Sequence, residues 1–228
     1  MPDLQFANAD AQGKAQVAWH TGEGSDKRPR FPGVLELKGQ LARGSAASVH
    51  RYLPLGIPAD ARQYVRQAVK SGQASQVNFK LKGYLEEFPF EKPGQGEFQI
   101  TAQLHDVDYD YVPAYLLDPG QQPWPPLHRL SGEFSMDRNA LAVRNVKGQL
   151  AGAGAIRVDE ARAAIADLSQ PEVLVGAKAH GGLNDMLAVV RGSALSALLD
   201  HALDESQGAG NAQLALQLRL PIHDMEHS

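Results

Sequence analysis

The densest group of side chains that could do chemistry is His105, Asp106, Asp108 and Asp110, which fall within six consecutive residues. Alternating carboxylates can present oxygen atoms to a calcium ion. A calcium loop of the EF-hand type needs a glycine directly after the third acidic position, where this chain has Tyr111, and it needs a glutamate further on. The pattern therefore favours a solvated turn at the end of a strand, and we predict no metal site and no cofactor.

A second group of possible metal ligands lies in the tail and consists of His223, Asp224, Glu226 and His227. Terminal residues usually lack a scaffold that fixes ligand geometry, so this group is also a weak metal candidate. The chain has no cysteine and no nucleophile elbow, phosphate-binding loop or zinc-protease helix motif. We therefore predict that the protein is not an enzyme and has no catalytic residue.

A third candidate is the aromatic stretch that contains Tyr109, Tyr111, Tyr115 and Trp124. Such rings can stack on bases, bind sugars or lie at a lipid boundary. Two prolines follow Trp124, so a rigid loop packed on a sheet edge explains the same residues, and we favour packing. A sugar-binding or hydrolase domain that uses this loop stays open as an alternative.

Composition narrows the function classes. The 228 residues carry 22 Lys and Arg against 26 Asp and Glu, so no basic footprint for nucleic acid exists and we expect no nucleic-acid partner. No stretch reaches the roughly 18 consecutive apolar residues of a membrane helix, and no signal peptide is visible in residues 1–10. Any membrane anchor is expected to lie outside this chain.

The elements that must position these residues follow a pattern that occurs twice: an amphipathic helix, a glycine break and an alternating strand. The first copy spans the helical positions 61–69, Gly72 and the strand at Val77, Phe79 and Leu81. The second copy spans positions 195–203, two glycines and the alternating leucines of 214–220. The spacing predicts helices over about 59–71 and 193–203, with shorter helices over 45–52 and 184–190.

Alternation elsewhere predicts eight to ten strands, of which Phe98, Ile100, Ala102 and Leu104 mark the clearest. Residues 158–168 fit a helix or a strand equally well. Because the connections look like hairpins and each strand has one apolar side, we predict a mainly β fold with a few short helices (α+β), built on an antiparallel single-layer sheet. The apolar side must then meet helices, another sheet or an apolar ligand.

Several short motifs occur in an order that resembles a known family. They are Arg51-Tyr-Leu-Pro-Leu-Gly-Ile-Pro, Asp60-Ala-Arg-Gln-Tyr-Val, Phe79-Lys-Leu-Lys-Gly, Phe88-Pro-Phe, Gly96-Glu-Phe, Trp124-Pro-Pro-Leu, Leu130-Ser-Gly-Glu-Phe and Gly182-Leu-Asn-Asp. Over residues 12–220 the chain resembles the central region of the YhdP-type, AsmA-like envelope proteins of Gram-negative bacteria. The resemblance favours a strand over 158–168.

The resemblance implies an elongated, curved sheet of repeated AsmA-like β units, with an apolar groove that carries phospholipid acyl chains between the inner and outer membranes. It further implies a periplasmic segment of an inner-membrane-anchored protein whose partners are phospholipid, neighbouring segments and envelope proteins. We expect one segment, 1–228, with sub-units 12–72, 73–182 and 183–222. The candidate groove residues are Val77, Phe79, Leu81, Phe98, Ile100, Leu104 and Phe134.

The alternative interpretation is a structural or protein-interaction module of the envelope, in which exposed sheet edges pair with a neighbour. The same apolar strand sides could also be covered by the two amphipathic helices and form an ordinary dry core. The sequence leaves the choice between an open and a covered face undecided.

Overall fold

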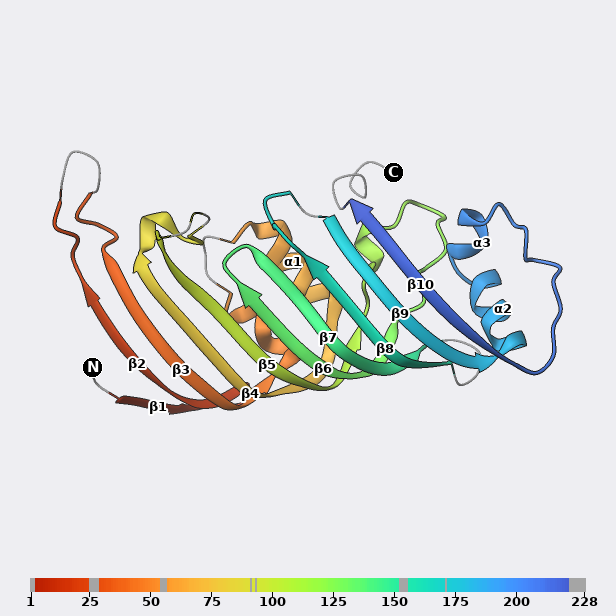
Figure 1. Ribbon diagram of the computed structural model, residues 1–228, viewed down its shortest axis with the longest axis horizontal. Coiled ribbons are helices and arrows are strands. Elements are labelled where there is room, and N and C mark those ends of the chain that lie inside the picture. The colour runs from red at the N-terminus through yellow and green to blue at the C-terminus, as the bar shows by residue number, and fades with distance from the viewer. Residues whose placement is uncertain are drawn as a thin grey trace.

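The computed structural model describes residues 3–24, 29–53, 57–90, 92, 94–151, 156–170 and 172–221. Within these residues ten strands form one antiparallel sheet, and each strand lies beside its neighbours in the chain, from β1 at one edge to β10 at the other (Figure 1). The strands are β1 (Asp3–Ala7), β2 (Ala11–His20), β3 (Val34–Ser45), β4 (Val69–Tyr84), β5 (Gly96–Tyr109), β6 (Leu127–Asp137), β7 (Ala140–Leu150), β8 (Arg157–Ile165), β9 (Glu172–Gly182) and β10 (Asn211–Pro221).

The helices of the described residues lie in four connections of the sheet. Their bounds are η1 (Ala46–Arg51) and α1 (Ala59–Ala68) between β3 and β4, η2 (Leu85–Glu87) between β4 and β5, η3 (Ala114–Leu116) between β5 and β6, and α2 (Leu183–Arg191) and α3 (Leu195–Leu198) between β9 and β10. The prediction of a mainly β protein with an antiparallel sheet and a few short helices is confirmed. Residues 157–165 form β8, as the resemblance implied. The repeated unit and the division into three sub-units stay predictions.

Two predicted helices are too long. The helix expected to reach residue 71 ends at Ala68, and Val69 already has extended backbone angles, so Gly72 lies inside β4 rather than after the helix. The helix expected to reach residue 203 ends at Leu198. Asp200 and His201 have φ angles of 50° and 60°, which a right-handed helix cannot contain.

The predicted short helices lie close to their expected places. η1 follows Ser45, whose side chain makes no capping hydrogen bond, and it is a 3-10 helix. α2 starts one residue before Asn184 and ends at Arg191, one residue beyond the expected limit.

The strand pairing keeps apolar side chains on one face of the whole sheet. Residues that pair directly across an antiparallel ladder project to the same face. One row of such pairs crosses all ten strands, and we call it the apolar row. It runs through Leu4, Ala15, Gly39, Phe79, Ile100, Met136, Leu141, Ile165, Val173 and Leu220.

The opposite face is polar. A comparable row of pairs on that face runs through Asp3, Gln16, Lys38, Lys80, Gln99 and Asp137. Cross-strand ion pairs join Lys82 to Glu36 at 3.4 Å and Lys178 to Glu160 at 3.2 Å. Lys80 pairs with Glu97 on the same face. The single layer therefore separates a hydrocarbon surface from a hydrated one.

Bulges bend the sheet, and the curvature of the strands is visible in Figure 1. The register shifts within the pairings of β4, β5, β6 and β7 with their neighbours. Four residues with positive φ lie at these shifts, namely Gln76, Asp106, Arg129 and Asn145. A bulge adds a residue to one strand, bends it and increases its twist, so this group of bulges accounts for the curvature.

Gly72 in β4 occupies a position that only glycine fits. Its φ is +114°, and a Cβ atom there would come within 2.6 Å of the Val107 Cα atom on the neighbouring strand. Gly120 has a φ of +89° but open space around it. A side chain would therefore strain the backbone at both positions, but it would clash with a neighbouring strand only at position 72.

We predict that Gly72→Ala lowers the free energy of unfolding by clearly more than Gly120→Ala does, with urea denaturation as the measurement. The backbone term alone costs about 1–2 kcal/mol for a non-glycine residue at such angles, and the Val107 contact adds to it only at position 72. Equal losses for the two variants would contradict the crowding argument.

Candidate functional site

The seven predicted groove residues lie together on the apolar face. Val77, Phe79 and Leu81 are on β4, Phe98, Ile100 and Leu104 are on β5, and Phe134 is on β6. Phe79 pairs with Ile100, Leu81 with Phe98, and Ala102 with Phe134. The structure thus gathers side chains from three neighbouring strands into one patch, which we call the apolar patch.

One end of the apolar patch is covered by the segment that follows η2. The Phe88 ring lies 5.0 Å from the Phe98 ring and 5.9 Å from the Phe90 ring, in edge-to-face arrangements. Phe90 is fully buried and Phe98 is only 6% exposed. Phe98 is therefore part of a packed aromatic cluster. The sequence analysis did not predict that this segment covers the sheet, although the two phenylalanines of Phe88-Pro-Phe90 are the apolar residues that could have indicated it.

The other end of β5 is covered by α1. The hydroxyl groups of Tyr64 and Tyr109 lie 2.7 Å apart, and the Tyr64 hydroxyl donates to the carbonyl oxygen of Tyr111 at 3.0 Å. Tyr109 pairs with Leu127 on the apolar face, so Tyr64 brings α1 over that face. Burial raises the pKa of both Tyr64 and Tyr109, because desolvation penalises the phenolate.

The aromatic stretch packs in the way that the sequence favoured. The rings of Tyr111 and Trp124 lie 6.1 Å apart, and burial, with the Asp110 carboxylate as a smaller cause, raises the pKa of Tyr111 to about 12. Tyr115 is 45% exposed. Tyr109, Tyr111 and Trp124 are thus engaged within the protein.

The middle of the apolar patch lies between the two covers. Phe79, Ile100, Leu104 and Phe134 are half-buried there, whereas Val77 is buried. Their side chains carry no polar atom, so this region offers hydrocarbon contact and no acid, base or nucleophile. Its chemistry is that of an apolar binding surface.

The side chains of the acidic cluster that opened the sequence analysis contact residues of the neighbouring strands rather than one another. His105 bonds to Ser75 at 2.7 Å, and Asp106 lies 3.8 Å from Arg129. Asp108 accepts the Arg129 N–H and lies 3.0 Å from His128, and both interactions lower its pKa. Strand β5 ends at Tyr109, so the cluster lies at a strand end as predicted, but Asp106 and Asp108 belong to the strand and not to a turn.

Within the described ranges, no three His, Asp or Glu side chains are grouped so that they could hold a metal ion. Asp110 lies 3.9 Å from Lys70, apart from the partners of the other acids. The tail candidates at 223–227 lie outside the described residues.

Ser196, His201 and Asp204 form a cluster that sequence reasoning missed. The Ser196 hydroxyl donates to Asp204 at 2.6 Å and lies 3.0 Å from His201 Nδ1, which also lies 2.8 Å from Asp204. A catalytic triad needs the serine and the carboxylate on opposite ring nitrogens, whereas here both contact Nδ1. Ser196 is also buried, so the cluster closes the turn after α3 and does not relay a proton.

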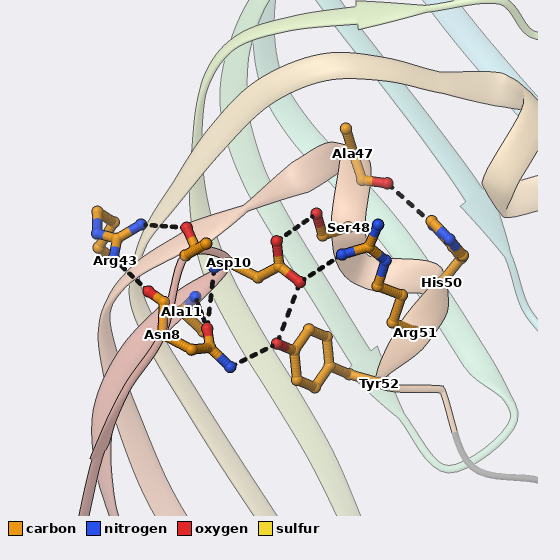
Figure 2. Close-up of polar contacts among 10 residues, drawn as sticks. Asn8, Asp10, Ala11, Arg43, Ala47, Ser48, His50, Arg51 and Tyr52 are labelled. Carbon is orange, nitrogen blue, oxygen red and sulfur yellow. Dashed lines mark hydrogen bonds and ion pairs between the residues drawn. The ribbon is translucent and has the colours of Figure 1, made fainter.

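Asp10 holds the turn between β1 and β2 against η1, as Figure 2 shows. Its carboxylate accepts hydrogen bonds from Ser48 at 2.9 Å, Arg51 at 2.9 Å and Tyr52 at 3.4 Å. The Ser48 hydrogen bond, followed by Arg51, lowers the pKa of Asp10. The first connection that leads to α1 is therefore anchored to the sheet by one carboxylate.

We predict that Asp10→Asn flattens the dependence of the unfolding temperature on pH at the acid end. A pKa below the ordinary value of 3.8 in the folded state means that the unfolded chain binds more protons, so the stabilisation is complete above that value and is lost as the pH falls through the folded pKa. Thermal unfolding from about pH 2 to pH 5 measures the slope. Identical slopes for the variant and the parent would rule out this role for Asp10.

We predict that Tyr64→Phe costs about 1–3 kcal/mol of stability, because it leaves the Tyr109 hydroxyl without its partner. The matched control is a double-mutant cycle with Tyr109→Phe, measured by urea unfolding. The double variant should lose less than the sum of the single losses. Additive losses would show that the two hydroxyl groups are not coupled.

The comparisons with known proteins give one match. A family model described as YhdP protein covers residues 1–228. No curated protein and no solved structure matches the chain. In the described part of the chain, every helix is too short or too polar to cross a membrane. Since the family match spans the whole sequence, the chain belongs to the YhdP family of AsmA-like envelope proteins.

Proposed function

We propose that this chain is a non-enzymatic segment of a bridge-like lipid transport protein in the bacterial envelope. Phospholipid acyl chains would lie on the apolar face of the sheet, while the polar face stays in water. In this proposal the segment is periplasmic, belongs to a protein anchored in the inner membrane, and adjoins neighbouring segments that continue the path between the membranes. Membership of the YhdP family supports the proposal.

The observation that carries the proposal is the apolar row. Nine successive pairings keep it on one face from β1 to β10, and no pairing in that row brings a polar side chain to the apolar face. A path of this kind is required if a hydrocarbon chain is to move along the sheet without meeting a charge. A closed protein core has no need for such continuity.

The energetics favour acyl chains as the ligand. Each methylene moved from water onto an apolar surface contributes about 0.8 kcal/mol, so an acyl chain can be held without a specific polar contact. The headgroup keeps its hydration if it projects beyond the sheet. Half-buried side chains in the middle of the apolar patch, such as Ile100 and Phe134, have exposed surface that an acyl chain can cover in place of water.

We predict that a photoreactive amino acid at Ile100 or Phe79 crosslinks to phospholipid when the chain is exposed to lipid vesicles or purified from cells. The matched controls are Thr101 and Lys80, which are the next residues along the same strands, are exposed and project to the polar face. Mass spectrometry of the adducts identifies the lipid. Equal labelling at the paired positions, or no lipid at Ile100 and Phe79, would overturn the proposal.

A further inference from the structure

The segment that covers one end of the apolar patch, residues 85–90, is anchored to the sheet through the ring of Phe90. We call this segment the strap. The Phe90 ring is fully buried and rests on Gly83 and Gly96, two glycines that pair directly across β4 and β5. A Cβ atom at either glycine would lie 2.7 Å from the ring. The two glycines therefore form a notch in the apolar face of the sheet, and the Phe90 ring fills it.

The backbone at Phe90 is strained. Its φ angle is +66°, which lies in the left-handed region that bulky residues avoid. Such strain persists only where the surrounding contacts outweigh it, and it is concentrated at ligand clamps and at segments that switch between two states. Burial of the ring thus holds the strap closed against the cost of its own backbone.

Beneath the strap the apolar patch continues. The Phe88 ring packs on the Phe98 ring at 5.0 Å, and Phe98 is 6% exposed. Ile100 lies two residues further along β5, projects to the same face and is half-buried. The covered and the open surfaces are therefore parts of one hydrocarbon face. Because the covering rings of the strap carry no polar atom, a hydrocarbon chain can replace their contacts.

We propose that the strap is a displaceable gate, and that a phospholipid acyl chain takes the place of the Phe90 ring in the notch between Gly83 and Gly96. This inference rests on the proposed function, because acyl chains must first reach the apolar patch. Displacement exchanges one hydrocarbon contact for another and lets the Phe90 backbone leave the left-handed region. Lipid that fills the notch binds only the open state, so it shifts the equilibrium towards that state.

Two backbone amides report on this equilibrium. The Phe90 N–H donates to the carbonyl oxygen of Glu87 at 2.7 Å, and this bond closes the turn that places Phe90 in the left-handed region. The Asp110 N–H donates to the carbonyl oxygen of Ala68 at 2.8 Å, at the end of α1. Opening of the strap breaks the first bond and leaves the second intact.

Hydrogen exchange of the parent chain, with and without vesicles of dioleoyl phosphatidylcholine, tests the displacement. The Phe90 amide should exchange at least about fivefold faster with lipid, because lipid turns an open state of about 0.1–10% of the chain into the major one. The Asp110 amide is the control and should keep its rate.

A photoreactive amino acid at Ile100 separates failure of the gate from failure of the proposed function. Crosslinking of the same vesicle lipid at Ile100, with unchanged or slower exchange at Phe90, would overturn the gate and leave the proposed function standing. Absence of lipid at Ile100 would overturn both.

The variant Phe90→Ala tests competition between the ring and the lipid. If the open state makes up about 0.1–10% of the parent chain, removal of the ring should tighten lipid binding at least about tenfold. Fluorescence titration with phosphatidylcholine that carries one pyrene-labelled acyl chain measures the affinity. Phe90→Leu, which keeps part of the packing in the notch, should give a smaller gain in the same direction.

The matched control is Phe31→Ala, which makes the same change at a phenylalanine that is 64% exposed and should not tighten binding. Thermal unfolding checks that each variant is folded. Equal affinities of the parent, Phe90→Leu and Phe90→Ala would overturn the gate, as would an equal gain from Phe31→Ala.

Discussion

The structure depends on a strand register that keeps apolar side chains on the same face of the sheet across nine strand pairings. A sheet with a period of two separates its side chains onto two faces, and a slip of one residue at any pairing would turn the following strands over. Here Phe79 faces Ile100, Ile100 faces Met136 and Met136 faces Leu141, so hydrocarbon stays beside hydrocarbon. Because the described strands form one sheet, burial of apolar surface depends on this phase and on the short segments that lie over the sheet ends.

Bulges curve the sheet without moving apolar side chains to the other face. At Gln76 strand β4 has one residue more than β5, yet Val77 and Phe79 beyond the bulge return to the face of Leu41 and Ile100. An extra residue in left-handed conformation absorbs the mismatch locally. Curvature and two-sidedness are thus compatible, and both are needed for an apolar surface that can partly enclose a hydrocarbon chain.

The polar side chains of the described region serve mainly to hold the covers in place. Asp10 fixes η1 to the first hairpin, Tyr64 fixes α1 to β5, and the cluster around Ser196 closes the turn after α3. Each group has its partners within the protein. In the proposed function, apolar side chains would contact the lipid, and these polar groups would keep the helices and turns in place on the sheet.

Alternation, composition and motif order were sufficient to predict the mainly β fold, the strands and the membership of the apolar patch, because the side chain period of a strand is a local property. Ends of elements were less predictable. Nothing local indicated that Asp200 and His201 would adopt positive φ, or that β5 would continue through its acidic residues to Tyr109. Those outcomes depend on partners that are distant in the chain, such as Tyr64 for Tyr109 and Arg129 for Asp108.

The covering of Phe98 and the exposure of β10 were likewise decided by tertiary structure. Phe98 and Leu218 are both apolar residues of alternating strands, and the sequence assigns them the same kind of face. One is buried because Phe88 packs on it, and the other is exposed because no described segment covers the last strand. The sequence by itself determined which side chains share a face, since that follows from backbone geometry, whereas only the folded chain decided which of them meet water, since that depends on which segments return over the sheet.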